Sequence, residues 1–480
     1  MAKKNLMYAC CTILWVVSSV LWASTSAGSV DTQSTDTSII KNQNSDGNAL
    51  HTNNNVKIGL SGKVAIQEGQ FVQGYFLGPD KGGKLTYPIW NHRAIAQIGL
   101  EAFVGSNFHI IIAPQVYLWS NTYPENMEGD HLGIVFKQWS FVSIADGEGV
   151  FSFGDSLKPY LQCAAGAMPF KYNPDAYNLG EYLFRSSPYP NRILTSFDNA
   201  LATLAGFRLS STLFGNLHQD LLLTTETDIM PLYDWSLSYL LSYKIPSLFD
   251  AGAGISLHHW FSVADYMTSP KSADAGGNQY LTANGDTSYY TFKGVKLVGR
   301  ASFDIKGILP KNISNLMGTQ DAKIFGEASV LGVRDYPAYK PLNGTLVLDT
   351  AKNFYGDIKN RIPIMLGFNF PAFKLLDVLS VQGEWWKWPY LNSFYSPLNQ
   401  GEYPTPKMTT TGITADDTKN GYVKWSVYAK KQVVSGFSII GQIADDHTFH
   451  ESYYTQYTSY IETFIKHGDW GWNLKLQYSF

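Results

Sequence analysis

The chain has 480 residues and a formal net charge of −3 at pH 7. A charge this small, without a basic cluster, excludes nucleic-acid binding as the expected function. Only 16% of the residues are charged, whereas 15% are aromatic, and a typical soluble domain carries about 25% charged residues. The composition is therefore typical of a protein that meets a membrane.

The amino terminus has the pattern of a secretory signal peptide. Lys3 and Lys4 precede an apolar run over residues 6–22, and small residues follow it. This pattern predicts a signal peptide over 1–27. A membrane anchor is the alternative, but the run is short for a spanning helix, which needs about 20 apolar residues. Cleavage would leave Cys163 as the single cysteine and would exclude an intramolecular disulfide.

Residues 28–55 consist mostly of Ser, Thr, Asn, Asp and Gln, and such a segment buries too little apolar surface to fold alone. We therefore predict a flexible polar segment over 28–55 and a single barrel domain over 56–480. After the signal peptide, no apolar run is long enough for a spanning helix. Only helices and closed barrels satisfy their backbone hydrogen bonds within lipid, so a membrane protein with this sequence has to be a barrel.

Short segments in which apolar and polar residues alternate recur from residue 56 to the end of the chain. Such alternation is typical of barrel strands, which have one face in lipid and the other in a wet lumen. The sequence thus predicts an all-β fold, a transmembrane antiparallel up-and-down β-barrel of about 16 strands. The predicted strands are 56–67, 94–102, 108–118, 132–142, 158–168, 199–209, 217–228, 233–245, 251–261, 291–305, 322–333, 361–370, 381–388, 422–430, 437–445 and 470–480.

Long polar connections alternate with compact ones along the predicted strands. We interpret the long ones as extracellular loops and the compact ones as periplasmic turns, with both chain ends on the periplasmic side. Two turns, 143–157 and 306–321, are longer than the others, and Pro310–Leu316 is predicted to form one helical turn. Residues 457–465 also resemble a strand and are interpreted as a strand extension or a hairpin within a loop, because a separate strand would break the parity.

The last predicted strand carries an aromatic and aliphatic face that ends in the carboxy-terminal residue. It resembles the final strand of bacterial outer-membrane β-barrels, and the resemblance implies recognition by the barrel-assembly machinery. It also implies an integral position in the outer membrane, in contact with lipid and lipopolysaccharide. The residues of this predicted assembly signal are Trp470, Trp472, Leu474, Leu476, Tyr478 and Phe480.

Three further stretches, 164–185, 375–381 and 468–472, resemble a poorly characterised barrel family of fibrobacterial, fibre-degrading bacteria. The resemblance implies a barrel fold and an outer-membrane location, and it supplies no activity and no functional residues.

Charged residues fall opposite the apolar face of several predicted strands and should therefore point into the lumen. Two interpretations stay open: ion pairing between strands in a wet lumen, and a transverse field that selects solutes. The pore-lining candidates on the wall are Glu101, Lys296, Arg300 and Lys424.

The predicted third extracellular loop, residues 169–197, carries further charges among many Tyr, Pro and Asn residues. In general porins with this number of strands the third loop folds inward and narrows the pore. The resemblance implies the same here, and an ordinary surface loop is the alternative. The pore-lining candidates of this loop are Lys171, Asp175, Glu181, Arg185 and Arg192.

No G-x-S-x-G and no H-E-x-x-H motif is present, so the sequence nominates no catalytic residues, metal site or cofactor. We predict an exported channel, not an enzyme, for the passive diffusion of small hydrophilic solutes or glycans. Nucleic acid is not an expected partner, and a homo-oligomer is left open. The alternatives are a surface protein that binds polysaccharide through long aromatic loops, or has a structural role, and a barrel hydrolase.

Overall fold

The computed structural model of the chain describes residues 49–53, 56–73, 89–125, 133–155, 158–184, 202–213, 215–225, 233–261, 263, 279–281, 287–289, 294–330, 333, 339–342, 345–348, 358–386, 422–445 and 470–480. Their main feature is one antiparallel sheet of 17 strands that closes on itself. Strand β1 (Ala49–Asn53) pairs with β2 alone, so the closed ring has 16 strands.

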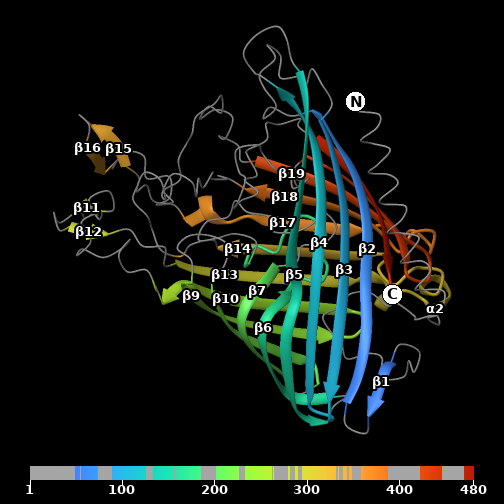
Figure 1. The fold of residues 1–480 in the computed structure, drawn as a ribbon. Coiled ribbons are helices and arrows are strands. Elements are labelled where there is room, and N and C mark those ends of the chain that lie inside the picture. Colours follow the sequence, from blue (N-terminus) through green and yellow to red (C-terminus); the bar gives the residue numbers. More distant parts are fainter. Residues whose placement is uncertain are drawn as a thin grey trace.

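The ring follows the order of the sequence, and each strand pairs with its neighbour along the chain. Figure 1 shows β2 to β5 as the longest strands of the wall. The sixteen strands are β2 (Val56–Gln73), β3 (Ile89–Val104), β4 (Phe108–Glu125), β5 (Gly133–Asp155), β6 (Lys158–Phe170), β7 (Ala202–Leu213), β8 (Leu217–Thr225), β9 (Trp235–Ile245), β10 (Phe249–Phe261), β13 (Gly294–Asp304), β14 (Lys323–Val330), β17 (Ile364–Asn369), β18 (Val378–Trp386), β19 (Tyr422–Val434), β20 (Phe437–Ala444) and β21 (Trp470–Ser479).

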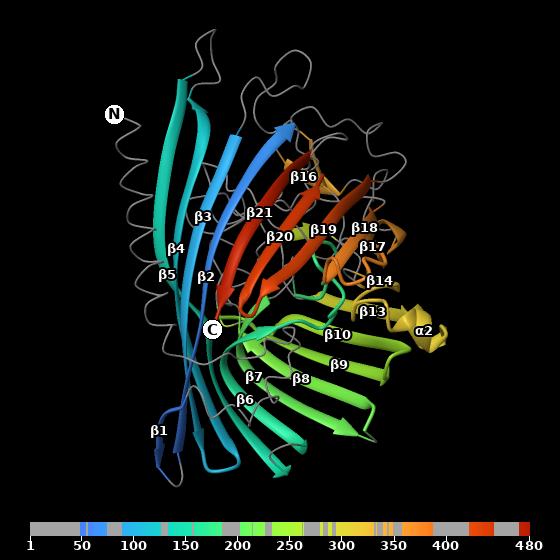
Figure 2. The ribbon, with the colours of Figure 1, turned by 90° about the vertical axis from the view of Figure 1, so that its right-hand side faces the viewer.

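The barrel closes between β2 and β21, which pair from Lys63↔Ser479 to Gln73↔Trp470. Figure 2 shows β21 beside β2 at this seam. The backbones of Gly62 and Phe480 exchange two hydrogen bonds of 2.9 and 3.0 Å. A Cβ atom on Gly62 would lie 2.4 Å from the Phe480 ring. The ring therefore fits at the seam because Gly62 has no side chain.

The alternation of side chains gives the wall an apolar outer face and a polar inner face. On β21, Leu474 and Leu476 are exposed on the outside, whereas Asn473 and Lys475 are buried on the inside. On β13, Leu297 is outside and Lys296 is inside. An apolar outer face is what a lipid environment requires of a barrel, and the alternation predicted from the sequence is thus confirmed on these strands.

Each of the sixteen predicted strands overlaps one strand of the ring, and the fold class predicted from the sequence is confirmed. The largest difference concerns residues 143–157, which the sequence predicted as a long turn. Strand β5 continues to Asp155, so this prediction was wrong. A β-bulge at Ala145 is the reason, because Ala113 pairs with Asp146 while Pro114 pairs with Ile144.

A bulge adds one residue to one strand and so exchanges the faces of the residues that follow it. Val142 and Ile144 are exposed on the outside, whereas Asp146 and Glu148 are buried on the inside. The even positions therefore change sides at Ala145, and the period-two pattern ends there although the strand does not.

Most connections at the end of the barrel where Phe480 lies are compact, and the β13–β14 connection is longer, as predicted; we call this the turn end. Gly105, with a φ of 65°, and Gly436, with a φ of 77°, take the left-handed conformation that two of these turns require. The β13–β14 turn holds a short 3-10 helix (Ile305–Ile308) and α2 (Lys311–Ser314), which confirms the predicted helical turn. Among the described residues, no helix has the length and apolar character to cross a membrane.

Several described pieces fall in ranges that the sequence assigned to loops or to the polar segment. Strand β1 lies within the predicted flexible segment and extends the sheet along the first residues of β2. Two small hairpins, β11 (Gln279–Leu281) with β12 (Thr287–Tyr289) and β15 (Tyr339–Leu342) with β16 (Thr345–Leu348), lie within two predicted loops. The predicted signal peptide and residues 457–465 lie outside the described residues.

Candidate functional site

The connection that follows β6 folds into the barrel over residues 171–184, which we call the inner segment. Ala176 and Leu179 of this segment are fully buried and pack with Phe325 of β14 and Met365 of β17. Burial of these apolar side chains is favourable by about 25 cal/mol per Å² of surface removed from water. The inner segment therefore lies against the lumen side of the wall.

Glu327 of β14 is the main polar anchor of the inner segment. Its Oε2 accepts hydrogen bonds from Asn173 Nδ2 at 2.7 Å and from the Glu181 backbone N–H at 2.9 Å. Its Oε1 accepts one from the Tyr182 backbone N–H at 2.8 Å. Both oxygens thus act as acceptors, as they do in an ionised carboxylate, and the carboxylate is buried together with the donors that surround it.

The backbone of the inner segment bends sharply where it approaches Glu327. Gly180 has a φ of 92° and Glu181 a φ of 61°, and the left-handed region is rare for residues that carry a Cβ atom. A Cβ atom on Gly180 would lie 3.0 Å from Glu327 Oε2 and 2.8 Å from Met365 Cε. A glycine is therefore required at position 180 for this approach.

A second group of contacts ties the inner segment to β18. The Gln382 Oε1 atom accepts from the backbone N–H groups of Asn178, at 2.9 Å, and Leu179, at 3.2 Å. The Tyr182 hydroxyl donates to Glu384 Oε2 at 2.6 Å. Acceptors on the wall thus bind both backbone and side-chain donors of the segment.

Aromatic contacts add to this attachment. The Tyr177 ring stacks on Tyr428 of β19 with centroids 4.6 Å apart. Tyr172 lies on the other flank among Met168, Leu222 and Val298. Burial raises the pKa of the Tyr172 hydroxyl well above its ordinary value, and the charges of Glu327 and Glu181 raise it further. Tyr172 therefore stays protonated through the physiological range of pH.

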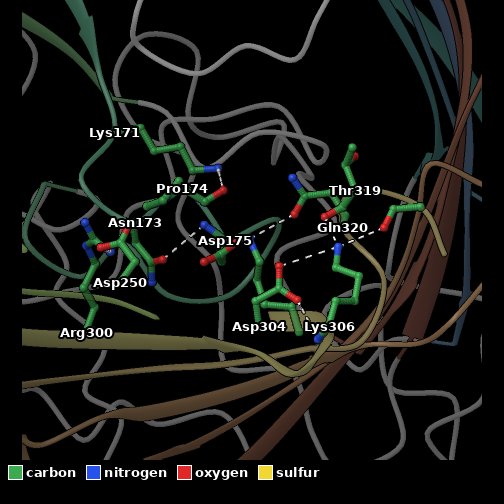
Figure 3. A network of polar contacts seen from close by, with 12 residues as sticks. Lys171, Asn173, Pro174, Asp175, Asp250, Arg300, Asp304, Lys306, Thr319 and Gln320 are labelled. Carbon is green, nitrogen blue, oxygen red and sulfur yellow. Dashed lines mark hydrogen bonds and ion pairs between the residues drawn. The ribbon is translucent and has the colours of Figure 1, made fainter. Parts of the chain in front are cut away.

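Cationic groups of β13 and β14 contact the inner segment or its surroundings. Lys323 Nζ lies 2.8 Å from Asp175 Oδ1, and the buried Lys296 Nζ donates to the Leu183 carbonyl at 3.5 Å. Arg300 instead pairs with Asp250 of β10 at 2.8 Å. Figure 3 shows this pair on the wall below Asn173, with Lys306 and Asp304 further along the wall.

Acidic groups also lie on the lumen side of β3, β5 and β8, together with Arg93 of β3 and Arg208 of β7. Asp146 and Glu148 of β5 are buried on the lumen side, and Asp220 of β8 pairs with His218 at 3.0 Å. Glu101 of β3 lies 3.7 Å from the ring of His109. Among the described residues, no group of three or more His, Cys, Asp or Glu side chains is arranged to hold a metal ion.

The predicted pore-lining residues have different surroundings in the structure. Asp175 and Glu181 are 3% and 1% exposed and belong to the attachment of the inner segment to the wall. The Glu181 carboxylate accepts from the Asn173 backbone N–H, whereas Lys171 extends over the Tyr177 ring at 5.7 Å. Arg185 and Arg192 lie outside the described residues.

The wall candidates lie at lumen-facing positions of three strands. They are Glu101 on β3, Lys296 and Arg300 on β13, and Lys424 on β19. Lys424 is buried on β19, in register with Glu384. Sequence reasoning missed the contact of Glu327 and Glu384 with the inner segment. The only signal for it in the sequence was a single acidic residue on each of two predicted strands.

Comparisons with solved structures return porins. The chain is similar to Salmonella typhi OmpF in complex with daunomycin, with 10% identity, a TM-score of 0.43 and coverage of 90% of this chain and 99% of that one. It is also similar to Pseudomonas putida OprB at low pH, with 8% identity, a TM-score of 0.41 and coverage of 88% and 92%. For a mutant of the Rh. blastica porin the identity is 9%, the TM-score 0.39 and the coverage 88% and 100%.

No protein-family model matches the chain, and no curated protein matches it. The TM-scores are low, so the class of the protein rests on its own hydrogen-bonded register. That register defines a closed antiparallel barrel of 16 strands, the architecture of water-filled porins. The resemblance to the fibrobacterial barrel family stays a prediction.

Proposed function

We propose that the protein is an integral outer-membrane channel through which small hydrophilic solutes diffuse passively. The observation that carries the proposal is the inner segment, which is fastened to one side of the wall by Glu327 and Gln382. A segment held in this way narrows a barrel lumen at one level and fixes the size of what passes. The apolar outer face and the polar inner face of the wall support the membrane location.

The charges of the lumen support a preference among solutes. Lys296, Arg300 and Lys323 lie on β13 and β14, where Arg300 pairs with Asp250 and Lys323 with Asp175, and Asp146 and Glu148 lie on β5. Charged groups that line a lumen act on passing ions and dipoles, and they favour the solutes whose charges match them. Because a narrow lumen screens charge less than bulk water does, these residues should affect ion selectivity.

Export and assembly complete the proposal. The predicted signal peptide over 1–27 directs the chain out of the cytoplasm, and the aromatic face that ends at Phe480 is read by the barrel-assembly machinery. In the membrane the apolar wall contacts outer-membrane lipid and lipopolysaccharide. We propose no catalytic step and no cofactor for this barrel.

Conductance of the purified full-length barrel in a planar lipid bilayer tests the proposal. Stepwise, ohmic current increments are expected, and liposomes that contain the barrel should swell in small sugars but not in large ones. Absence of current increments from a barrel that is correctly inserted and heat-modifiable would refute the channel. Such a result would favour the second candidate, a surface barrel that binds ligands without conducting.

A further inference from the structure

One row of polar side chains crosses the lumen face of five neighbouring strands, each residue directly opposite the next. The register places Asn369 of β17 opposite Ser380 of β18, Ser380 opposite Tyr428 of β19, Tyr428 opposite Gln442 of β20, and Gln442 opposite Asn473 of β21. We call these five residues the polar row. Directly opposed residues on neighbouring strands have Cβ atoms about 4.5–5.5 Å apart, so the row is continuous.

Several atoms of the polar row are buried without a hydrogen-bond partner among the described residues. They are Nδ2 and Oδ1 of Asn369, Oγ of Ser380, and Nε2 and Oε1 of Gln442. All three side chains are at least 98% buried. Buried polar groups in proteins are almost always hydrogen-bonded, and three unpartnered side chains in one row therefore need an explanation.

The next level of the wall repeats this pattern. Gln382 of β18 lies opposite Ser426 of β19, and both side chains are almost fully buried. Gln382 Nε2 and Ser426 Oγ have no partner among the described residues. Gln382 Oε1, in contrast, accepts the two N–H groups of the inner segment. The Oε1 atom of Gln382 thus binds the segment, whereas its NH₂ group has no hydrogen-bond partner among the described residues.

The inner segment covers the polar row at its centre. Tyr177 stacks on Tyr428 and also packs against Val378 and Ile440, which flank the row. The contact between segment and wall is apolar and aromatic here, and it supplies no hydrogen bond to the side chains of Asn369, Ser380 and Gln442. A solute that enters between the segment and the wall could satisfy them, and the Tyr177 and Tyr428 rings would offer it an apolar face.

The unpartnered atoms define the chemistry of such a solute. They include amide donors, carbonyl acceptors and hydroxyl groups, and a hydroxyl both donates and accepts. An anion would satisfy only the donors, and a cation only the acceptors. A ligand with many hydroxyl groups satisfies both kinds, and the side chains of the row itself carry no formal charge. The row therefore fits a neutral, polyhydroxylated molecule.

We propose that the polar row, with Gln382 and Ser426, is a binding site for sugars or polyols, and that it opens when the Tyr177 part of the inner segment moves off the wall. The inference rests on the proposed channel in that the ligand is a solute of the lumen. Binding at the row would slow neutral hydroxylated solutes relative to ions of similar size.

Equilibrium binding to the purified full-length barrel tests the site without reference to conduction. The probes are sorbitol and maltose, which are neutral, and gluconate, which has the carbon skeleton of sorbitol with a carboxylate. Saturable binding of at least one neutral probe, and weaker binding of gluconate, is expected. Binding of gluconate as tight as that of sorbitol, or saturable binding of neither neutral probe, would overturn the proposal.

Substitutions locate the site on the wall. Asn369→Leu with Gln442→Leu should weaken binding about tenfold or more, as expected for the loss of a few hydrogen bonds. Gln115→Leu is the matched control, because Gln115 lies on β4 and donates to Ser143 at 2.9 Å. Ser380→Ala with Ser426→Ala is a second, smaller change that should also weaken binding if the leucine variant does not fold. Unchanged affinity in a folded row variant contradicts the site.

Conductance of the same proteins separates this proposal from the channel itself. A barrel that conducts but binds no neutral probe keeps the channel and loses the site. A barrel that binds sorbitol or maltose but passes no current keeps the site and loses the channel. In a conducting barrel that binds, sorbitol should add current noise that the Asn369→Leu, Gln442→Leu variant lacks.

Discussion

The attachment of the inner segment to Glu327 predicts a large effect of the substitution Glu327→Gln. The carboxylate accepts three hydrogen bonds from the segment, and a bond to a charged group contributes about 1.5–3 kcal/mol. Glutamine keeps one acceptor oxygen and turns an NH₂ group towards the remaining donors. One or two of the three bonds should therefore be lost, a change of about 2–4 kcal/mol in the free energy of docking.

A change of this size alters the ratio of docked to undocked segment by about thirty- to a thousandfold, since each 1.4 kcal/mol is tenfold. Hydrogen exchange measures it directly, because the N–H groups of Glu181 and Tyr182 are the donors to Glu327. Both amides should exchange faster by a similar factor, and the single-channel current should become larger or noisier. Glu148→Gln, a carboxylate of the far wall, is the control and should leave both amides unchanged.

Equal protection of the Glu181 and Tyr182 amides in the parent and in Glu327→Gln would refute this reasoning. The carboxylate would then be a passive neighbour of the segment, and the apolar packing of Ala176 and Leu179 would hold it alone.

Further predictions concern closure, insertion, topology and selectivity. Gly62→Val should displace the Phe480 ring and destabilise the seam, which is measured as a loss of heat-modifiable mobility on gels. Unchanged heat-modifiable mobility would contradict the close packing of Gly62 and Phe480. Leu474→Asp should reduce membrane insertion, because a charged side chain on the lipid face destabilises the barrel. A basic residue at the midplane costs about 2–4 kcal/mol, and an acidic residue costs less. A tag within 246–249 should stay hidden from surface labelling of intact cells. Arg300→Gln should shift reversal potentials towards cation selectivity, since it leaves the charge of its partner in the lumen unopposed; an unshifted potential would place it off the conducting path.

The sequence predicted the wall of the barrel well because lipid and lumen impose a simple period-two pattern on each strand. The last strand, residues 470–480, shows this pattern along its whole length, and the structure confirms it. The pattern was misleading where a bulge interrupts it. Beyond Ala145, Asp146-Gly-Glu-Gly149 has the composition of a turn, yet these residues belong to β5, and residues 147–149 pair with both β4 and β6.

The inner segment could be predicted only in part. Its charged residues are visible in the sequence, but their partners are not, because the bond from Glu181 to Glu327 spans 146 residues. Contacts of this kind depend on the curvature of the closed wall, which brings β14 and β18 to the connection after β6. Periodicity describes a single strand and carries no information on which strands face each other across the lumen.

The seam between β2 and β21 has a consequence for the order in which the protein folds. It joins residues that are 406 positions apart, as in the bond from Gln67 to Asn473, and pairing between such distant residues is slow. Until the last residues arrive, β2 and the growing sheet expose two unpaired edges, and exposed edges promote aggregation. A chain without residues 470–480 would therefore lose the closure of the barrel as well as one strand. It would be an open sheet whose two edges have no partner strand.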